Sequence, residues 1–167
     1  YNYFALNELQ ASAGEWQPFH LVDLPGLGYA KVPEAQRRKW LRFLGAYAAR
    51  RQQLRLIVHL IDGQVGPMPT DLEIMRMLRD AHAHPAADLA VDSAGGSEQS
   101  CGWQYAVVLT KVDKGKKSIE NVERLVRQAI ADSGCPQPVS IVPTSAKSKV
   151  GREDVWRLMR PVVLPDK

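Results

Sequence analysis

Short apolar segments that end in polar residues recur along this chain, and they constrain its fold more than any other feature. A strand buried on both faces of a parallel sheet is continuously apolar, and functional residues lie at its carboxyl end. Four segments fit this description: 19–22 before Asp23, 56–61 before Asp62, 105–109 before Thr110, and 139–142 before Pro143. The segment 1–9 alternates more loosely and is expected to form an antiparallel edge strand.

Helical spacing marks the segments between these strands. Four helices are predicted: one from Pro33 onward with Trp40, Leu44 and Ala48 on one face, one from Thr70 through Leu78, one over 119–130, and a short one around Trp156. Thr70 and Glu73 fit a capping box at the start of the second helix. Gly134 suits the end of the third helix, because glycine tolerates positive φ. Alternating strands and helices predict an α/β fold with a largely parallel sheet.

The composition sets further limits on the class of protein. The 167 residues, 45% hydrophobic and 24% charged, suit one domain and exclude a disordered tail, a collagen-like repeat and a coiled coil. No apolar run reaches the roughly 18 residues of a membrane span, and the first residues lack a signal-peptide pattern. Two cysteines are too few for a disulfide framework, so a reducing intracellular compartment is expected. The net charge of +4 suits an RNA or phosphate partner.

One segment breaks the alternation. Residues 82–104 are rich in Ala, Ser and Gly and show no period, so they are interpreted as a surface insertion. This low-complexity segment is the reason to expect a mitochondrial or plastid location if the protein is eukaryotic; a bacterial protein would be cytoplasmic.

An Asp-Leu-Pro-Gly motif follows the strand predicted over 19–22. Asp23 could hold Mg²⁺, directly or through water, because carboxylate oxygens suit hard cations. Gly26 has no Cβ, so its N–H can come within hydrogen-bond reach of a phosphate. Alone, this pattern is more often a turn than a site.

Thr110-Lys111-Val112-Asp113 closes another strand. The Asp113 carboxylate can accept hydrogen bonds from the ring N–H and the exocyclic amine of guanine, and adenine has no such donor pair on that edge. The Lys111 stem can pack over the purine and ribose. An exposed charge pair on a surface turn explains the same residues equally well.

Thr144-Ser145-Ala146-Lys147 closes the last strand. The small residues Ser145 and Ala146 would let backbone N–H groups approach the purine carbonyl oxygen, although taken alone a helix-entry loop is the better explanation. The three motifs occur in the order, and at the strand ends, that a guanine-nucleotide site requires. We therefore expect their loops to converge on a single pocket.

With these motifs the chain resembles the TRAFAC-class GTPases, and the stretch 21–32 is similar to the EngB (also YihA or YsxC) family, whose signature there is Asp-x-Pro-Gly-x-Gly-Tyr-Ala. Further matches are Trp40, the run of Asp62, Gly66, Pro67 and Asp71, and Gly151 with Trp156. The resemblance covers nearly the whole chain apart from about 82–104. It implies a P-loop NTPase fold, a Ras-like and largely parallel sheet flanked by helices.

The resemblance also implies a GTPase switch that uses GTP or GDP and Mg²⁺. By role, its site residues would be Asp113 with Thr110 and Lys111 for the base, Ser145 and Ala146 at the purine oxygen, Asp23 for Mg²⁺, and Gly26 for the γ-phosphate. The implied task is assembly of the large ribosomal subunit, with its precursor, rRNA, ribosomal proteins or other assembly factors as partners. We expect a monomer and no membrane partner.

The chain departs from the family pattern in two ways. These 167 residues contain no Gly-x-x-x-x-Gly-Lys-Ser/Thr phosphate loop. Residues 1–167 are therefore expected to be the C-terminal portion of the domain, from its second strand on. They would lack the central strand between the 19–22 and 56–61 strands and would not bind GTP tightly alone. Leu27 stands where Ras-like enzymes orient the attacking water with glutamine, so slow hydrolysis is expected without a partner.

Other interpretations stay open. One is a non-catalytic ribosome-assembly or RNA-binding factor on a degenerate GTPase scaffold, and another is an α/β domain for a different purine nucleotide. The basic residues after Pro33 and those over 114–117 and 147–152 could bind rRNA phosphates, although such faces are usually only solvated. The remaining candidates are given structural interpretations: His82, His84 and Cys101 as loop residues rather than metal ligands, His20 and His59 as core histidines, and Cys135 as structural.

Overall fold

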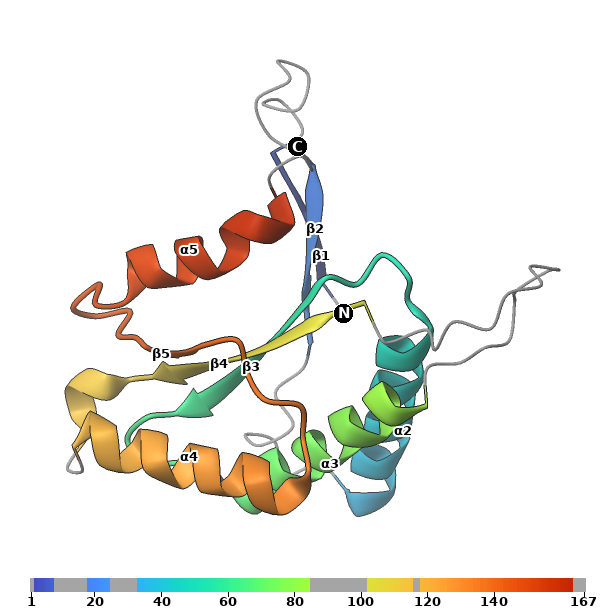
Figure 1. Ribbon diagram of the computed structural model, residues 1–167, viewed down its shortest axis with the longest axis horizontal. Coiled ribbons are helices and arrows are strands. Elements are labelled where there is room, and N and C mark those ends of the chain that lie inside the picture. The colour runs from blue at the N-terminus through green and yellow to red at the C-terminus, as the bar shows by residue number, and fades with distance from the viewer. Residues whose placement is uncertain (1, 8–17, 25–32, 85–101, 116–117, 164–167) are drawn as a thin grey trace, which may run out of the picture.

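The computed structural model describes residues 2–7, 18–24, 33–84, 102–115 and 118–163 (Figure 1). Its elements, in chain order, are β1 (Asn2–Leu6), β2 (Phe19–Asp23), α2 (Glu34–Arg50), β3 (Leu56–Asp62), α3 (Pro69–Ala83), β4 (Gln104–Thr110), the 3₁₀ helix η1 (Val112–Lys114), α4 (Ile119–Ser133), β5 (Ile141–Pro143) and α5 (Arg152–Val163). Strands and helices alternate, which confirms the predicted α/β class.

A three-stranded parallel sheet with the order β3-β4-β5 forms the centre of the fold. Its register places Asp62 opposite Thr110 and Leu109 opposite Pro143, so the carboxyl ends of the three strands lie level. The last strand begins at Ile141 rather than at Val139, where the sequence analysis placed its start. In Figure 1, α3 and α4 lie on one side of this sheet and α5 lies on the other.

The core fills the space between the sheet and the layer of α3 and α4. Residues with at most 1% exposure come from both sides of it: Ile61, Val107 and Leu109 from the sheet, and Met75, Val122, Val126 and Ile130 from the helices. Each fully buried aliphatic side chain of this size contributes about 1.5–3 kcal/mol relative to an exposed one. The α4 stripe and the left-handed Gly134 at φ 69° occur where the sequence predicts them.

His59 is a hydrogen-bonded core histidine, as predicted. It is 6% exposed; its Nδ1 lies 3.0 Å from the Tyr105 hydroxyl oxygen, and its Nε2 lies 3.2 Å from Asp71 Oδ1. Cys135 is buried close to Tyr105, and burial raises the pKa of its thiol to about 12, which agrees with a structural role. The prediction of a core histidine is wrong for His20, which is exposed on β2.

The predicted capping box of Thr70 and Glu73 is wrong. Helix α3 begins at Pro69, and the Met68 N–H donates to Asp71 Oδ2 at 2.7 Å. Proline suits the first helical position, because its fixed φ matches the helix and the N–H that it lacks would have no helical partner there. Glu73 instead pairs with Arg37 of α2 at 3.3 Å, and this pair links the two helices.

The boundaries of the predicted insertion are also corrected. His82 lies within α3, and its ring packs edge-on against Trp103 with centroids 5.4 Å apart. The Trp103 Nε1–H in turn donates to the Ala48 carbonyl oxygen of α2 at 2.9 Å. Gln104 opens β4, and residues 85–101, with Cys101 among them, lie outside the described residues.

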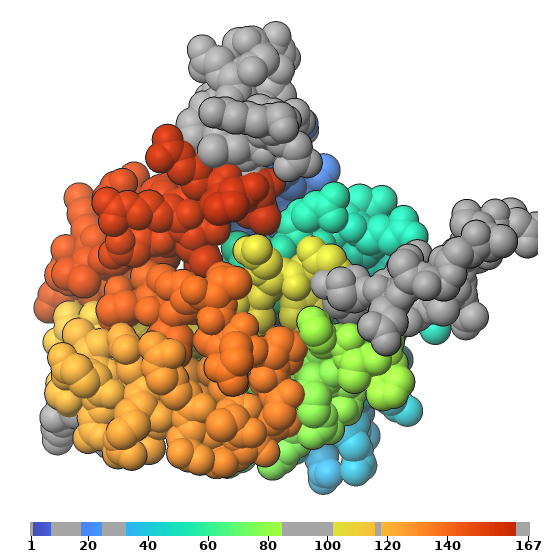
Figure 2. All heavy atoms as spheres, in the orientation of Figure 1, coloured from blue at the N-terminus to red at the C-terminus, as the bar shows by residue number. Residues whose placement is uncertain are grey.

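Strands β1 and β2 form a separate antiparallel hairpin. Among the described strands, β3 pairs only with β4, and Leu60 on it is 63% exposed. In Figure 2 the cyan segment that leads into β3 reaches the surface beside the yellow β4. The described strands thus divide into two sheets between β2 and β3. Within the described helices, none has both the length and the apolar character needed to cross a bilayer.

The packing of β4 leads to a stability prediction. Val107→Ala removes two carbons from a side chain with no exposed surface, so it should lower the free energy of unfolding by about 2–3 kcal/mol. Val139→Ala is the matched control, because Val139 is 54% exposed beside β5 and its truncation should cost less than about 0.5 kcal/mol. Urea unfolding of both variants measures the difference, and equal losses would contradict the core described above.

Candidate functional site

Two predicted loops meet at the carboxyl edge of the parallel sheet. Backbone hydrogen bonds join them: the Thr144 N–H donates to the Leu109 carbonyl oxygen at 2.7 Å, and the Val112 N–H donates to the Thr144 carbonyl oxygen at 3.1 Å. The Thr144 hydroxyl adds a bond to Leu109 O at 3.0 Å. The structure therefore brings residues 110–113 and 144–147 together.

Ser145 holds the carboxylate of Asp113. Its hydroxyl donates to Asp113 Oδ1 at 2.6 Å and accepts a hydrogen bond from the Ser148 N–H at 3.1 Å. Ser145 is 1% exposed, whereas Asp113 is exposed. The site thus presents a solvent-accessible carboxylate whose direction is fixed by a buried neighbour.

The electrostatic surroundings keep this carboxylate charged. The hydrogen bond from Ser145 contributes most to lowering the pKa of Asp113; its own backbone N–H and the charges of Lys114 and Lys147 lower it further, against a smaller opposing effect of desolvation. Each of these donors and cations stabilises the ionised form. Asp113 is therefore a hydrogen-bond acceptor at neutral pH.

Lys111 lies on the other side of the same loop. Its backbone is left-handed, with φ 57° and ψ 33°, which is uncommon for a residue other than glycine. Its ammonium nitrogen lies 2.7 Å from Asp62 Oδ2 at the end of β3. Asp62 was not among the predicted site residues, although it follows an apolar strand just as Asp23 does.

Thr110 serves the sheet as well as the loop. Its hydroxyl donates to the Ile61 carbonyl oxygen at 3.3 Å, and its own carbonyl oxygen accepts the Gly63 N–H at 2.7 Å. A Cβ on Gly63 would lie 2.7 Å from that oxygen, so only glycine allows this close approach. The strand ends of β3 and β4 are thereby locked together at the site.

The loop that carries Ser145 and Ala146 closes on Gly151. The Ser145 N–H donates to the Val150 carbonyl oxygen at 3.1 Å, while Ala146 is exposed beside it. Gly151 has φ 74°, and a Cβ there would collide with the Pro143 carbonyl oxygen. The loop conformation therefore depends on glycine at this position, which is one of the residues matched in the resemblance.

Of the remaining predicted site residues, Asp23 is the one that the described part of the chain contains, and it is not joined to these loops. Asp23 ends β2 in the separate hairpin, where it accepts a hydrogen bond from Asn2 Nδ2 at 3.4 Å. Gly26 and Leu27 lie outside the described residues. No cluster of three or more His, Cys, Asp or Glu side chains suited to a metal occurs in the part of the chain that the structure describes. The described residues thus do not assemble a Mg²⁺ site around Asp23.

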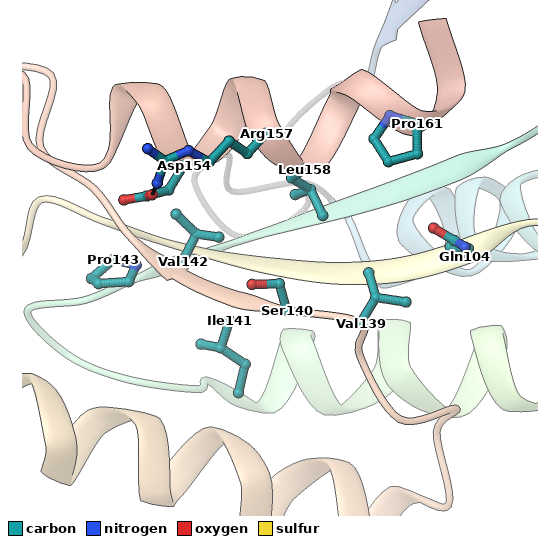
Figure 3. A pocket seen from close by; sticks show the side chains of 10 residues that line it. All are labelled: Gln104, Val139, Ser140, Ile141, Val142, Pro143, Asp154, Arg157, Leu158 and Pro161. Carbon is teal, nitrogen blue, oxygen red and sulfur yellow. Dashed lines mark hydrogen bonds and ion pairs between the residues drawn. The ribbon is translucent and has the colours of Figure 1, made fainter. Parts of the chain in front are cut away.

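A cavity of about 580 Å³ lies away from these loops, between α5 and the β5 edge of the sheet (Figure 3). In Figure 3, Leu158 of α5 lies toward Val142, and Pro161 of α5 lies toward Gln104 and Val139. Its charged lining residues, Asp154 and Arg157, pair with each other at 3.0 Å. The cavity offers apolar surface and a neutralised ion pair, and it includes neither Lys111 nor Asp113.

The hydrogen bond between Ser145 and Asp113 gives a titration prediction. Ser145→Ala should raise the pKa of Asp113 towards the ordinary aspartate value of about 3.9. Because the pKa of Asp113 is lower in the folded than in the unfolded protein, its ionisation stabilises the fold above the unfolded-state pKa, and this stabilisation is lost as the pH falls through the folded-state pKa. With a higher folded-state pKa, the variant should have a smaller stabilisation and should lose it at a higher pH.

Carbon-13 NMR titration of the side-chain carboxyl measures this pKa. Ser118→Ala is the matched control, because the pKa of Glu120 is lowered first by its own backbone N–H and then by the Ser118 hydroxyl, whose bonds do not involve Asp113. An unchanged Asp113 pKa in Ser145→Ala would contradict the described geometry.

Curated relatives share most of this chain, although no family model matches it. A "Probable GTP-binding protein EngB" of Symbiobacterium thermophilum is 32% identical over 153 residues, which cover 91% of this chain and 56% of the relative. Another of the same name, from Chlorobaculum tepidum, is 31% identical over 152 residues, with 91% and 62% covered. The chain thus spans a little over half the length of these relatives.

A solved structure shares the fold. The apo form of translation elongation factor SelB from Methanococcus maripaludis aligns with a TM-score of 0.55 and 20% identity, covering 86% of this chain and 25% of that one. At this identity the likeness concerns the fold alone, and it confirms the predicted parallel sheet flanked by helices. Over most of its length the chain is thus similar to proteins named as probable GTP-binding proteins EngB, and its parallel sheet and two joined loops agree with that similarity.

Proposed function

We propose that the full-length protein is a guanine-nucleotide-binding GTPase switch and that this chain supplies its base-recognising part. The exposed, ionised and fixed carboxylate of Asp113 is the observation that carries the proposal. The names of the EngB relatives support it, because they describe GTP-binding proteins.

The geometry of Asp113 suits guanine. Ser145 binds one carboxylate oxygen from the buried side, and the exposed carboxylate can accept the adjacent ring N–H and amine of the base. Hydrogen bonds to an ionised acceptor are about twice as strong as neutral ones. Adenine offers no such pair of donors, so the carboxylate would discriminate between the purines as well as bind.

Phosphate binding and hydrolysis rest on other residues. The 167 residues contain no Gly-x-x-x-x-Gly-Lys-Ser/Thr motif, whose backbone N–H groups and lysine hold phosphates in P-loop proteins. In the proposal, Asp23 contributes to Mg²⁺ binding and Gly26 to γ-phosphate binding within the full-length protein. Because Leu27 cannot orient water, hydrolysis would be slow unless a partner positions the water.

Asp113→Asn tests the base assignment in the full-length protein. An amide presents a donor where guanine also has a donor, so GTP affinity should fall about 10- to 100-fold, as expected for losing one hydrogen bond to a charged group of about 1.5–3 kcal/mol. Xanthosine triphosphate has a carbonyl in place of the amine and should bind the variant better than GTP. Calorimetry with both nucleotides measures this exchange.

Asp132→Asn is the control for that experiment, because Asp132 is exposed on α4 and contacts Gln128. It should leave both affinities unchanged. Unaltered GTP affinity in Asp113→Asn would refute the base assignment. A wild-type protein that binds RNA but no nucleotide would favour the alternative of a non-catalytic assembly factor.

We further propose that the partner is the precursor of the large ribosomal subunit, and that the protein contacts its rRNA through one face of α2. Residues 34–55 carry seven Lys or Arg and one Glu, whereas the whole chain has a net charge of only +4. The exposed basic residues of this segment, here called the α2 basic face, are Arg38, Lys39, Arg42 and Arg50 of α2 together with Arg51 and Arg55, which follow the helix.

An aromatic ring lies among these charges. Phe43 is 45% exposed and stacks on Tyr47 with centroids 6.5 Å apart and an interplanar angle of 25°. Arginine and lysine bind phosphates, and exposed aromatic rings can stack on unpaired bases. This combination favours RNA over a purely solvated face.

Charge reversal on the α2 basic face should weaken RNA binding. Lys39→Glu with Arg42→Glu should lower affinity for transcribed large-subunit rRNA and flatten the dependence of log K on log salt by about 0.7–0.9 per lost phosphate contact. Filter binding over a salt series measures both. Arg124→Glu with Arg127→Glu has the same spacing at exposed positions of α4 and should change RNA affinity much less; equal losses would indicate a general charge effect.

A further inference from the structure

We propose that Asp62 is a positioning residue that holds the Lys111 side chain beside Asp113 as one wall of the base site. This inference rests on the proposed function and extends it to a residue outside the predicted set. The structural basis is an ion pair between neighbouring strand ends, with Lys111 Nζ 2.7 Å from Asp62 Oδ2.

The sheet register brings the two groups together. Asp62 on β3 lies opposite Thr110 on β4, and Lys111 is the next residue along the chain. The left-handed backbone of Lys111 leads directly into η1, which carries Asp113. Lys111 thus contacts Asp62 at the end of β3, while Asp113 is held by Ser145, which follows β5.

Asp62 is itself firmly placed. Its Oδ1 accepts the Gln64 N–H at 2.9 Å, and its carbonyl oxygen accepts the Gly66 N–H at 2.8 Å. Gly66 has φ 91°, which lets the turn close. A carboxylate fixed by a tight turn can set the direction of a flexible lysine, whose free side chain has considerable rotamer entropy.

The exposure of the pair separates a ligand-binding role from a stabilising one. The Lys111 side chain is 41% exposed and that of Asp62 is 20% exposed. Such partly exposed ion pairs add little to fold stability. By restricting the Lys111 side chain before the nucleotide binds, Asp62 would instead reduce the side-chain entropy that is lost on binding. Removing the ion pair should therefore speed nucleotide release rather than lower the stability of the fold.

A double-mutant cycle in the full-length protein tests the coupling. Asp62→Asn keeps an acceptor for the Gln64 N–H but removes the charge, and it should speed GDP release about 3- to 10-fold. Lys111→Met should also speed release. Asp62→Asn added to Lys111→Met should have no further effect, because the residue that it positions is already gone. Stopped-flow release of a fluorescent GDP analogue measures all four proteins.

The controls separate the possible outcomes. Asp80→Asn removes an exposed carboxylate paired with Arg79 and should leave release unchanged, whereas Asp62→Glu should restore part of the slow release. Additive effects of Asp62→Asn and Lys111→Met, or a lowered Tm with unchanged release, would overturn the positioning role while leaving the base assignment intact. Absence of any guanine-nucleotide binding by the wild type would overturn both proposals.

Discussion

The parallel ladder on both sides of β4 is the constraint on which the rest of the structure depends. It sets Asp62 level with Thr110 and Leu109 level with Pro143, so the chain leaves three strands at one edge. The polar residues that follow these strands therefore lie close together because of the backbone register alone. The loop after β4 is the middle one, and its neighbours hold it from both sides through Lys111 and Asp113.

Much of this fold could be predicted because burial leaves a clear pattern. Most of the fully buried residues of β4 and α4 are apolar at the positions that strand and helix geometry require, and Ser133 at the end of α4 is the polar exception. Local features were harder to predict. The start of α3 depends on Pro69 and on Asp71 bonding back to Met68, and a competing capping pattern two residues later concealed it. His20 lies in an apolar segment, yet it is exposed, because its strand belongs to a two-stranded hairpin rather than to the buried parallel sheet.

The candidate site was predictable to a similar degree. The spacing of the last two motifs correctly placed residues 110–113 beside 144–147, because both follow strands of one parallel sheet. The pair of Asp62 and Lys111 depends on register, which cannot be deduced from either motif alone. Asp23 is a different case. Its strand lies in another sheet of the described structure, so the expected meeting of three loops is found for two of them.

The outer side of β3 has a consequence for the behaviour of the isolated chain. Within the described residues no strand covers it, and Val58 and Leu60 face outward with 36% and 63% of their surface exposed. A row of unpaired amides and carbonyls flanked by aliphatic groups is a template on which another extended chain can polymerise. In the described part of the chain, the outer edge of β3 is therefore the place where a further extended strand could add to the sheet.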